Sequence, residues 1–304
     1  MPDILMAILP VFMLLALGWW FRRRRFPGEA LWDLLDPLVY YVLLPSLLLH
    51  TFATVDLGQL EVLPAGLAVI SAMLLASLLL LALRPRLGLD GPGFAALLQA
   101  TVRFNTYVGF AVASQLYGSA GLTLFSVVVA FVTPTANVIS VYGFTRFGSS
   151  ARPRLRQQLA TLASNPLILS VLGGVALNVS GVGLPWVLEP FFEVLGRAAL
   201  PLGLLAAGAG LELTALRRTG GHVALGCALR LGLMPLLTIA TTWVFGVEGL
   251  TRICVILYAL MPVPPGAYIL ARQLGGDARY TAALIAATTL VALVTAPAWL
   301  LLLR

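Results

Sequence analysis

The feature that most constrains this chain is a succession of long apolar stretches, each close to the length that crosses a bilayer. About 20 helical residues, rising 1.5 Å each, span the roughly 30 Å hydrocarbon core. Ten such stretches are present, near residues 3–21, 32–53, 60–83, 93–117, 119–145, 162–181, 186–211, 221–245, 250–273 and 279–303. The stretch 73–81 is apolar on every face, without the alternation of a membrane β-barrel. The sequence therefore predicts an all-α integral membrane protein with ten transmembrane helices.

The arginines predict the orientation of these spans. All 19 basic residues are Arg, and most lie in short joints after spans 1, 3, 5, 7 and 9, whereas the other joints are nearly bare. The positive-inside rule then places both termini outside. The cluster Arg22–Arg25 follows span 1 instead of preceding it, so this span is expected to remain as an anchor. The net charge of +7 thus indicates topology and a lipid partner, and no nucleic acid. An Arg-only, Leu- and Ala-rich chain suggests a multi-pass protein of a bacterial inner membrane.

An internal repeat divides the chain into two halves. At an offset of 156 residues, Pro45 falls on Pro201 and Asp56 on Glu212, and near Gly118 and Gly276 the offset is 158. The predicted units are residues 1–147, a cytoplasmic linker at 148–161, and residues 162–304. Because each half has five spans, the second half enters the membrane upside down. Inverted repeats are typical of secondary transporters, whose sites lie where discontinuous helices meet.

Spans 4 and 9 are the candidates for discontinuous helices. Span 9 contains Pro262, Pro264 and Pro265, followed by Gly266, and an ordinary helix cannot continue through them. The 156-residue offset places Asn105–Thr106 on Met261–Pro262, which predicts a looser break in span 4. If the two broken helices cross, the positive ends of their half-helices attract an anion.

Arg103 gives this hypothesis a charged group. A lone Arg at the bilayer centre costs at least about 2.5 kcal/mol, so its presence needs a reason. Its guanidinium matches a carboxylate in two parallel hydrogen bonds. The alternatives are that Arg103 extends to the membrane surface, or that it pairs with Asp33 or Asp36 to hold helices together. The predicted substrate-binding residues are Arg103, Asn105, Thr106, Met261, Pro262, Val263, Pro264, Pro265 and Gly266.

Four further polar residues are candidates for supporting or coupling roles. Asn137 either faces the crossover or bonds between helices, and Asn165, before Pro166, has the pattern of a helix cap. Asp56 and Glu212 either end solvated helices or carry H⁺ or Na⁺. Coupling therefore stays open between H⁺, Na⁺ and none, and no cofactor or metal is predicted.

Three other functional classes would each require features of their own. An intramembrane enzyme would need a nucleophile with a base, paired aspartates or a metal motif, and no such pattern is visible. An anion channel would need a ring of filter residues. A ligand sensor without net transport could use the same fold, but no signalling domain is evident.

Several stretches together resemble the auxin efflux carrier family, including bacterial permeases labelled malate or malonate transporters. They are RFNTYVGFAV, LYGSAGL, NPLILSVLGGVALNVSGVGLP, AALPLGLLAAGAGLEL and MPVPPGAYILARQLGGD. The resemblance implies two inverted five-helix repeats, with helices 4 and 9 unwound where they cross. It also implies a scaffold of spans 1, 2, 6 and 7 beside a mobile transport domain of spans 3–5 and 8–10. Asn105 matches the family's crossover asparagine and Pro262 its crossover proline. The chain lacks the long central loop of many plant members.

These lines together predict a secondary carrier of small organic anions or weak carboxylic acids that works by alternating access of the elevator type. A homodimer formed through the scaffold spans is a further expectation.

Overall fold

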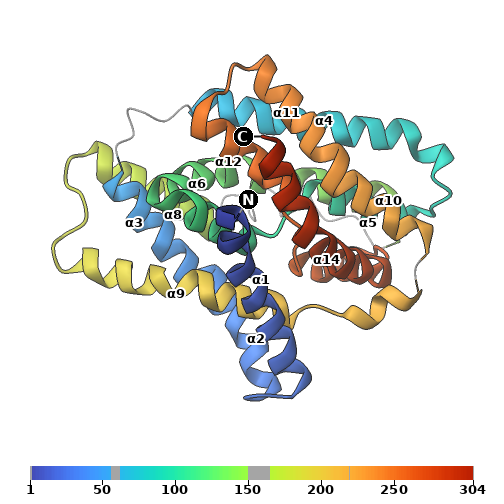
Figure 1. The fold of residues 1–304 in the computed structure, drawn as a ribbon, viewed down its shortest axis with the longest axis horizontal. Helices are drawn as coiled ribbons and strands as arrows, with labels where there is room; N and C mark the ends of the chain where they lie inside the picture. Colours follow the sequence, from blue (N-terminus) through green and yellow to red (C-terminus); the bar gives the residue numbers. More distant parts are fainter. Residues whose placement is uncertain (1, 56–61, 150–164, 219, 304) are drawn as a thin grey trace.

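The computed structural model describes residues 2–55, 62–149, 165–218 and 220–303, and these residues form helices and joints without a strand (Figure 1). The predicted linker at 148–161, beyond its first two residues, lies outside the described residues, as does Asp56. The α-helices are α1 (Pro2–Arg23), α2 (Glu29–Leu38), α3 (Leu44–Thr54), α4 (Val62–Leu83), α5 (Gly91–Val102), α6 (Thr106–Phe147), α8 (Pro166–Val179), α9 (Leu188–Ala209), α10 (Gly221–Ala228), α11 (Met234–Val244), α12 (Gly249–Leu260), α13 (Gly266–Gln273) and α14 (Ala278–Leu302). The shorter elements are the π turns η1 (Val39–Leu43) and η5 (Leu229–Leu233) and the 3₁₀ turns η3 (Arg84–Arg86) and η4 (Leu213–Arg218).

Seven helical stretches of the described residues are long and apolar enough to cross a membrane. Their number differs from the ten predicted spans for two reasons. Predicted spans 4 and 5 are counted together as Gly91–Phe147, although the backbone turns out of the helix at Gly118, with φ/ψ of 60°/−145°. The helices at Pro166–Val179 and Gly249–Leu260 are shorter than a full crossing. The fold is that of an all-helical, multi-pass membrane protein.

The chain leaves the helical path at both predicted interruptions. Between α5 and α6, Arg103 and Asn105 have extended backbone, and between α12 and α13 the chain is non-helical from Met261. The prolines explain the second break, since they remove donors from the helical ladder. The first break contains no proline, and it was predicted from the internal repeat and the family resemblance. The two breaks touch, because the N–H of Asn105 donates to the carbonyl of Pro262 at 2.7 Å.

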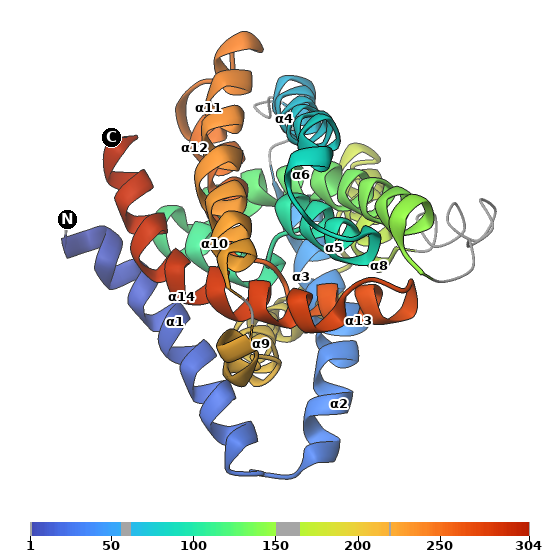
Figure 2. The ribbon, with the colours of Figure 1, turned by 90° about the vertical axis from the view of Figure 1, so that its right-hand side faces the viewer.

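The helices pack in two groups. In the first group, α1 packs along α9, and α3 packs against both α8 and α9. In the second group, α4 packs against α6 and α11, α6 against α5 and α12, and α10 against α14. Figures 1 and 2 show α3 and α9 on one side of the molecule and α4 and α11 away from them. Predicted spans 1, 2, 6 and 7 correspond to the first group, and the remaining spans to the second.

Two glycines explain why α1 and α9 lie so close. A Cβ added to Gly18 would come within 2.1 Å of the carbonyl oxygen of Leu205, and one added to Gly208 within 2.0 Å of that of Leu15. Small residues let helix backbones approach in a membrane, where dispersion contacts replace the hydrophobic driving force.

Several arginine-bearing joints meet at one end of the second group. The guanidinium of Arg84, after α4, lies 4.3 Å from the ring centre of Phe147 at the end of α6. The N–H of Ser149 donates to the carbonyl of Gly275 at 2.9 Å, and that of Asp277 to the carbonyl of Pro92 at 3.2 Å. The joints after α4, α6 and α13 therefore share one end, as the positive-inside pattern requires.

Candidate functional site

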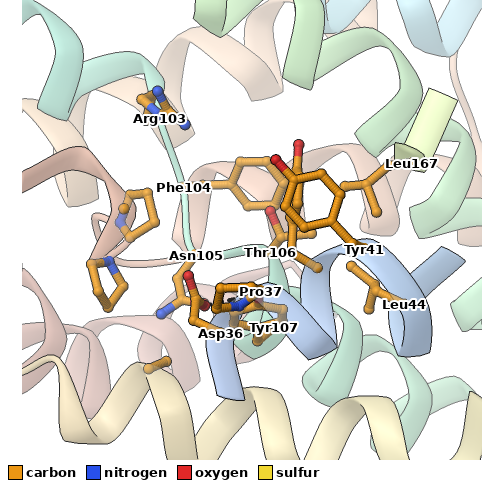
Figure 3. Close-up of a pocket in the computed structure, with 15 residues that line it drawn as sticks. Asp36, Pro37, Tyr41, Leu44, Arg103, Phe104, Asn105, Thr106, Tyr107 and Leu167 are labelled. Atoms are coloured by element: carbon orange, nitrogen blue, oxygen red, sulfur yellow. Dashed lines mark hydrogen bonds between the residues drawn. The ribbon is translucent and has the colours of Figure 1, made fainter. Parts of the chain in front are cut away.

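A cavity of about 300 Å³ opens where the broken helices meet (Figure 3). Both helix groups line it. The first group contributes Asp36, Pro37, Tyr40, Tyr41, Leu44, Leu167 and Ala207; the second contributes Arg103, Phe104, Asn105, Thr106, Tyr107, Pro264, Pro265 and Gly266. The cavity thus lies at the contact between two bodies of helices, where a relative movement would change its access.

Two helix starts border this cavity. Asn105 caps α6, its Oδ1 accepting from the N–H of Val108 at 3.3 Å, and Pro265 and Gly266 begin α13. The first N–H groups of a helix have no intrahelical partner, and the helix dipole gives that end a partial positive charge. The two starts therefore make this cavity favourable for an anion.

Arg103 adds a full positive charge to the cavity. It is half-buried at the end of α5, and Figure 3 shows it at one end of the extended segment that continues to Asn105. Within the described residues it forms no ion pair with a carboxylate, so the alternative pairing with Asp33 or Asp36 is not present in this structure. Its electrostatic neighbour is Tyr40.

Asp36 lies at the other end of the segment, beside Tyr107 (Figure 3). The hydroxyl of Tyr107 donates to Asp36 Oδ1 at 3.1 Å. This bond crosses the cavity from the second helix group to the first. The cavity thus carries one cationic and one anionic side chain that do not neutralise each other directly.

A π turn presents two tyrosines to the cavity. Pro45 has no N–H to donate to the carbonyl of Tyr41, and the helix widens to a π turn over Val39–Leu43 before α3 begins. Tyr40 and Tyr41 lie in that turn and line the cavity. The proline therefore helps to place these two rings.

The structure separates the predicted site residues into two sets. Arg103, Asn105, Thr106, Pro264, Pro265 and Gly266 line the cavity. Met261, Pro262 and Val263 do not; they are packed in the interior, where the N–H of Val263 donates to Thr288 Oγ1 at 3.0 Å. Their place is therefore behind the cavity, as support for the crossover.

Three of the four additional candidates are among the described residues, and they lie in different places. Asn165 is 4% exposed and caps α8, its Oδ1 accepting from the N–H of Leu167 at 2.9 Å, so its predicted capping role is confirmed. Asn137 is half-buried on α6 and does not line the cavity. Glu212 is exposed after α9, in a separate hollow with Arg22 and Arg23, so it is not drawn into this cavity.

Arg230 is the charged residue that the sequence reasoning overlooked. It is fully buried in η5 and donates to the carbonyls of Met261, Thr101 and Tyr258. A signal was available, because Arg230 stands in the apolar stretch CALRLGLM and carries the same cost of a buried charge as Arg103. Asp36, Tyr40, Tyr41 and Tyr107 were likewise not predicted to form the site.

The comparisons with known proteins concern the chain as a whole. Residues 150–300 match the "Membrane transport protein" family, that of the auxin efflux carriers. The predicted family resemblance is thereby confirmed.

Two curated relatives cover nearly the whole chain. A protein of Methanothermobacter thermautotrophicus named "Uncharacterized transporter" is 26% identical over 296 residues, which are 96% of each chain. A protein of Rhizobium meliloti named "Putative malonate transporter" is 26% identical over 322 residues, covering 100% of this chain and 97% of the relative. The family and these names indicate a membrane transporter.

Proposed function

We propose that this protein is a secondary carrier of small organic anions or weak carboxylic acids, with its substrate in the crossover cavity. The observation that carries the proposal is the cavity itself, in which two helix starts and Arg103 converge. An arginine without a carboxylate partner in the described residues can bind a substrate carboxylate through two parallel hydrogen bonds. Asn105 and Thr106 would add polar contacts beside it. No chemical step on the substrate is part of this proposal.

The proposed architecture is ten helices in two inverted repeats. Helices α5 and α12 support it, because each has 12 residues, and their N-caps Asp90 and Glu248 are 158 positions apart. The C-caps Arg103 and Met261 keep that offset, with φ/ψ of −80°/146° and −80°/145°. At the crossover an offset of 158 therefore fits better than the 156 used to place Asn105 on Met261.

The proposed movement is of the elevator type. The first helix group (spans 1, 2, 6 and 7) would serve as the scaffold, and the second would carry the substrate. The placement of the cavity between the groups supports this assignment, as does a further cavity of about 560 Å³ lined by His50, Thr54, Ser119 and Thr251. This second cavity also has lining residues from both helix groups. Both cavities therefore lie at the contact between the two groups. A homodimer through the scaffold and a bacterial inner-membrane location with both termini outside complete the proposal.

The membrane potential is a sufficient driving force for anion export, since it supplies about 2.3 kcal/mol per charge per 100 mV. Coupling to H⁺ is a separate property, which the pH gradient in the following experiment is designed to detect.

The test is uptake and counterflow of labelled malate, malonate and an aromatic acid in proteoliposomes, with an imposed potential or pH gradient. We expect saturable flux in the parent, and its loss in Arg103→Gln at substrate concentrations near the parent's KM. Arg252→Gln is the matched control, because Arg252 is an arginine of α12 that stacks on Trp243 and does not line the cavity. Flux that is equally lost in both variants, or retained in both, would remove Arg103 from substrate binding.

The same experiment distinguishes the rival classes. Flux without saturation or counterflow would identify an anion channel. Specific binding of an acid without flux would identify a ligand sensor. No flux and no binding of any acid would reject the organic-anion proposal.

A further inference from the structure

The buried guanidinium of Arg230 is held by backbone carbonyls. Its side chain is 0% exposed. Nε donates to the carbonyl of Met261 at 2.9 Å, Nη1 to that of Thr101 at 3.0 Å, and Nη2 to that of Tyr258 at 2.6 Å. It forms no ion pair within the described residues, and its guanidinium carbon lies 5.1 Å from the ring centre of Tyr258. A permanent charge therefore rests in the interior on neutral acceptors.

Those three carbonyls stand at the ends of both half-helices. Thr101 is in the last turn of α5, while Tyr258 and Met261 are in the last turn and at the C-cap of α12. The last carbonyls of a helix have no intrahelical partner, and that end carries a partial negative charge. Where two such ends converge, a cation is favoured, and in transporters with broken helices such ends and unwound carbonyls coordinate the coupling ion.

The local fold is built to deliver Arg230 to this point. Pro235 cannot donate to the carbonyl of Leu231, and the helix widens to the π turn Leu229–Leu233. The released carbonyl of Leu231 accepts from Trp299 Nε1 at 2.9 Å. The irregular turn is thus stabilised by α14 while its arginine reaches the two half-helix ends.

We propose that Arg230 is a tethered cation that occupies the position of a coupling ion, so that the crossover is complete without Na⁺ or K⁺. The proposal rests on the proposed carrier function. It implies that transport by this carrier does not require Na⁺ or K⁺. Arg230 is a positioning residue: it holds the ends of α5 and α12 together, and it does not line the anion cavity.

The test measures thermal unfolding of the purified full chain in detergent, at constant ionic strength, with NaCl, KCl or choline chloride. The parent should melt at the same temperature in all three salts. Arg230→Ala should melt roughly 10 °C lower, because the buried carbonyls of Thr101 and Met261 lose their donor and that of Tyr258 loses one of two. Methylguanidinium at millimolar concentration should restore most of that loss in a saturable way. Arg252→Ala removes an arginine of α12 that does not bond to these carbonyls, so methylguanidinium should not raise its melting temperature.

Three results would overturn the proposal: a saturable rise of the parent's melting temperature with Na⁺ or K⁺, an unchanged melting temperature in Arg230→Ala, or a loss that methylguanidinium does not restore. If Arg230→Ala does not fold, the melting temperatures of Arg230→Lys and of the parent in the three salts still test the proposal. Arg230→Lys keeps the charge with a different set of donors, so it should melt between the parent and the alanine variant.

A flux measurement separates this inference from the proposed function. Parent proteoliposomes should exchange labelled acid equally in Na⁺, K⁺ and choline media, and exchange that requires Na⁺ would refute Arg230 as the replacement ion. A parent that transports no acid at all would reject the carrier proposal, whereas the melting experiments would still test the tethered cation.

Discussion

Arg103 and Arg230 are both permanent cations inside apolar stretches, but they meet different parts of the crossover. Arg103, at the end of α5, borders the cavity that the starts of α6 and α13 also line, and it forms no ion pair within the described residues. Arg230 is completely enclosed and has three carbonyl acceptors at the ends of α5 and α12. The donors of Arg103 are thus available to a ligand, whereas those of Arg230 are used in hydrogen bonds to the backbone.

This difference follows from the polarity of a broken helix. Each break exposes one positive helix start and one negative helix end. A chain that crosses two breaks therefore creates an anion-attracting side and a cation-attracting side. In this protein the cation-attracting side is filled by Arg230, and the anion-attracting side is left as a cavity of about 300 Å³. The predictions below test that contrast, starting from the largest expected effect.

Replacing each arginine by methionine should affect stability very differently. Arg230→Met should lower the melting temperature by roughly 10 °C, since it removes the donor of the buried carbonyls of Thr101 and Met261 and one of two donors to that of Tyr258. Arg103→Met should stay within about 3 °C of the parent, because it removes no hydrogen bond of the folded backbone. Thermal unfolding of the two variants side by side checks this, and an equal loss in both would end the comparison.

Substrate affinity should show the reverse order. Arg103→Gln should raise the KM for a transported acid by roughly 10- to 100-fold, because a charge-assisted contact contributes about 1.5–3 kcal/mol. The KM of Arg103→Lys should lie between those of the parent and of Arg103→Gln, since an ammonium keeps the charge without the planar fork. Concentration-dependent counterflow measures both. A KM that is unchanged in Arg103→Gln would place the carboxylate elsewhere.

Asn105 allows its capping and its binding role to be separated. Asn105→Asp keeps an acceptor for the N–H of Val108, so stability should be preserved, but it adds a negative charge to an anion cavity and should reduce flux about tenfold or more. Asn105→Ala removes the cap, which should cost about 1 kcal/mol. Comparing melting and flux for the pair gives the test. An Asp variant with full flux would argue against an anionic substrate.

The smallest effect is expected at the bond between the two helix groups. Tyr107→Phe removes the hydroxyl that donates to Asp36, a contact that must open if the groups move apart. Its loss should change counterflow by no more than about fivefold, because such a bond contributes about 1 kcal/mol to this conformation. Tyr41→Phe, which lines the same cavity without a described bond to Asp36, is the control. A complete loss of flux in Tyr107→Phe alone would make the hydroxyl part of the binding site.

The break in span 9 could be predicted from local chemistry alone. Pro262, Pro264 and Pro265 remove three backbone donors within four residues, so an ordinary helix cannot continue through them. Arg103 could be singled out for the cost of a charge in lipid. The same reasoning applied to Arg230 would have marked it too, but most arginines were assigned to topology as a class. Asp36 was considered only as a partner of Arg103.

The residues that sequence reasoning missed are joined over long separations. The bond from Tyr107 to Asp36 spans 71 residues, and the bond from Arg230 to Thr101 spans 129. No periodicity or motif encodes such contacts, because they arise when separate helices pack. Likewise, Met261 and Val263 were placed in the site by their position in the motif, and only the packing of Thr288 against the break shows that they face the interior.

The sequence by itself determined that the chain is helical, that it crosses a membrane several times and where one helix breaks, because apolar length and missing backbone donors act locally. The tertiary structure alone decided which ends of the broken helices face the cavity and which receive Arg230. That choice depends on the direction in which distant half-helices meet, and the electrostatics of a helix end has an effect only when another part of the chain is brought to it.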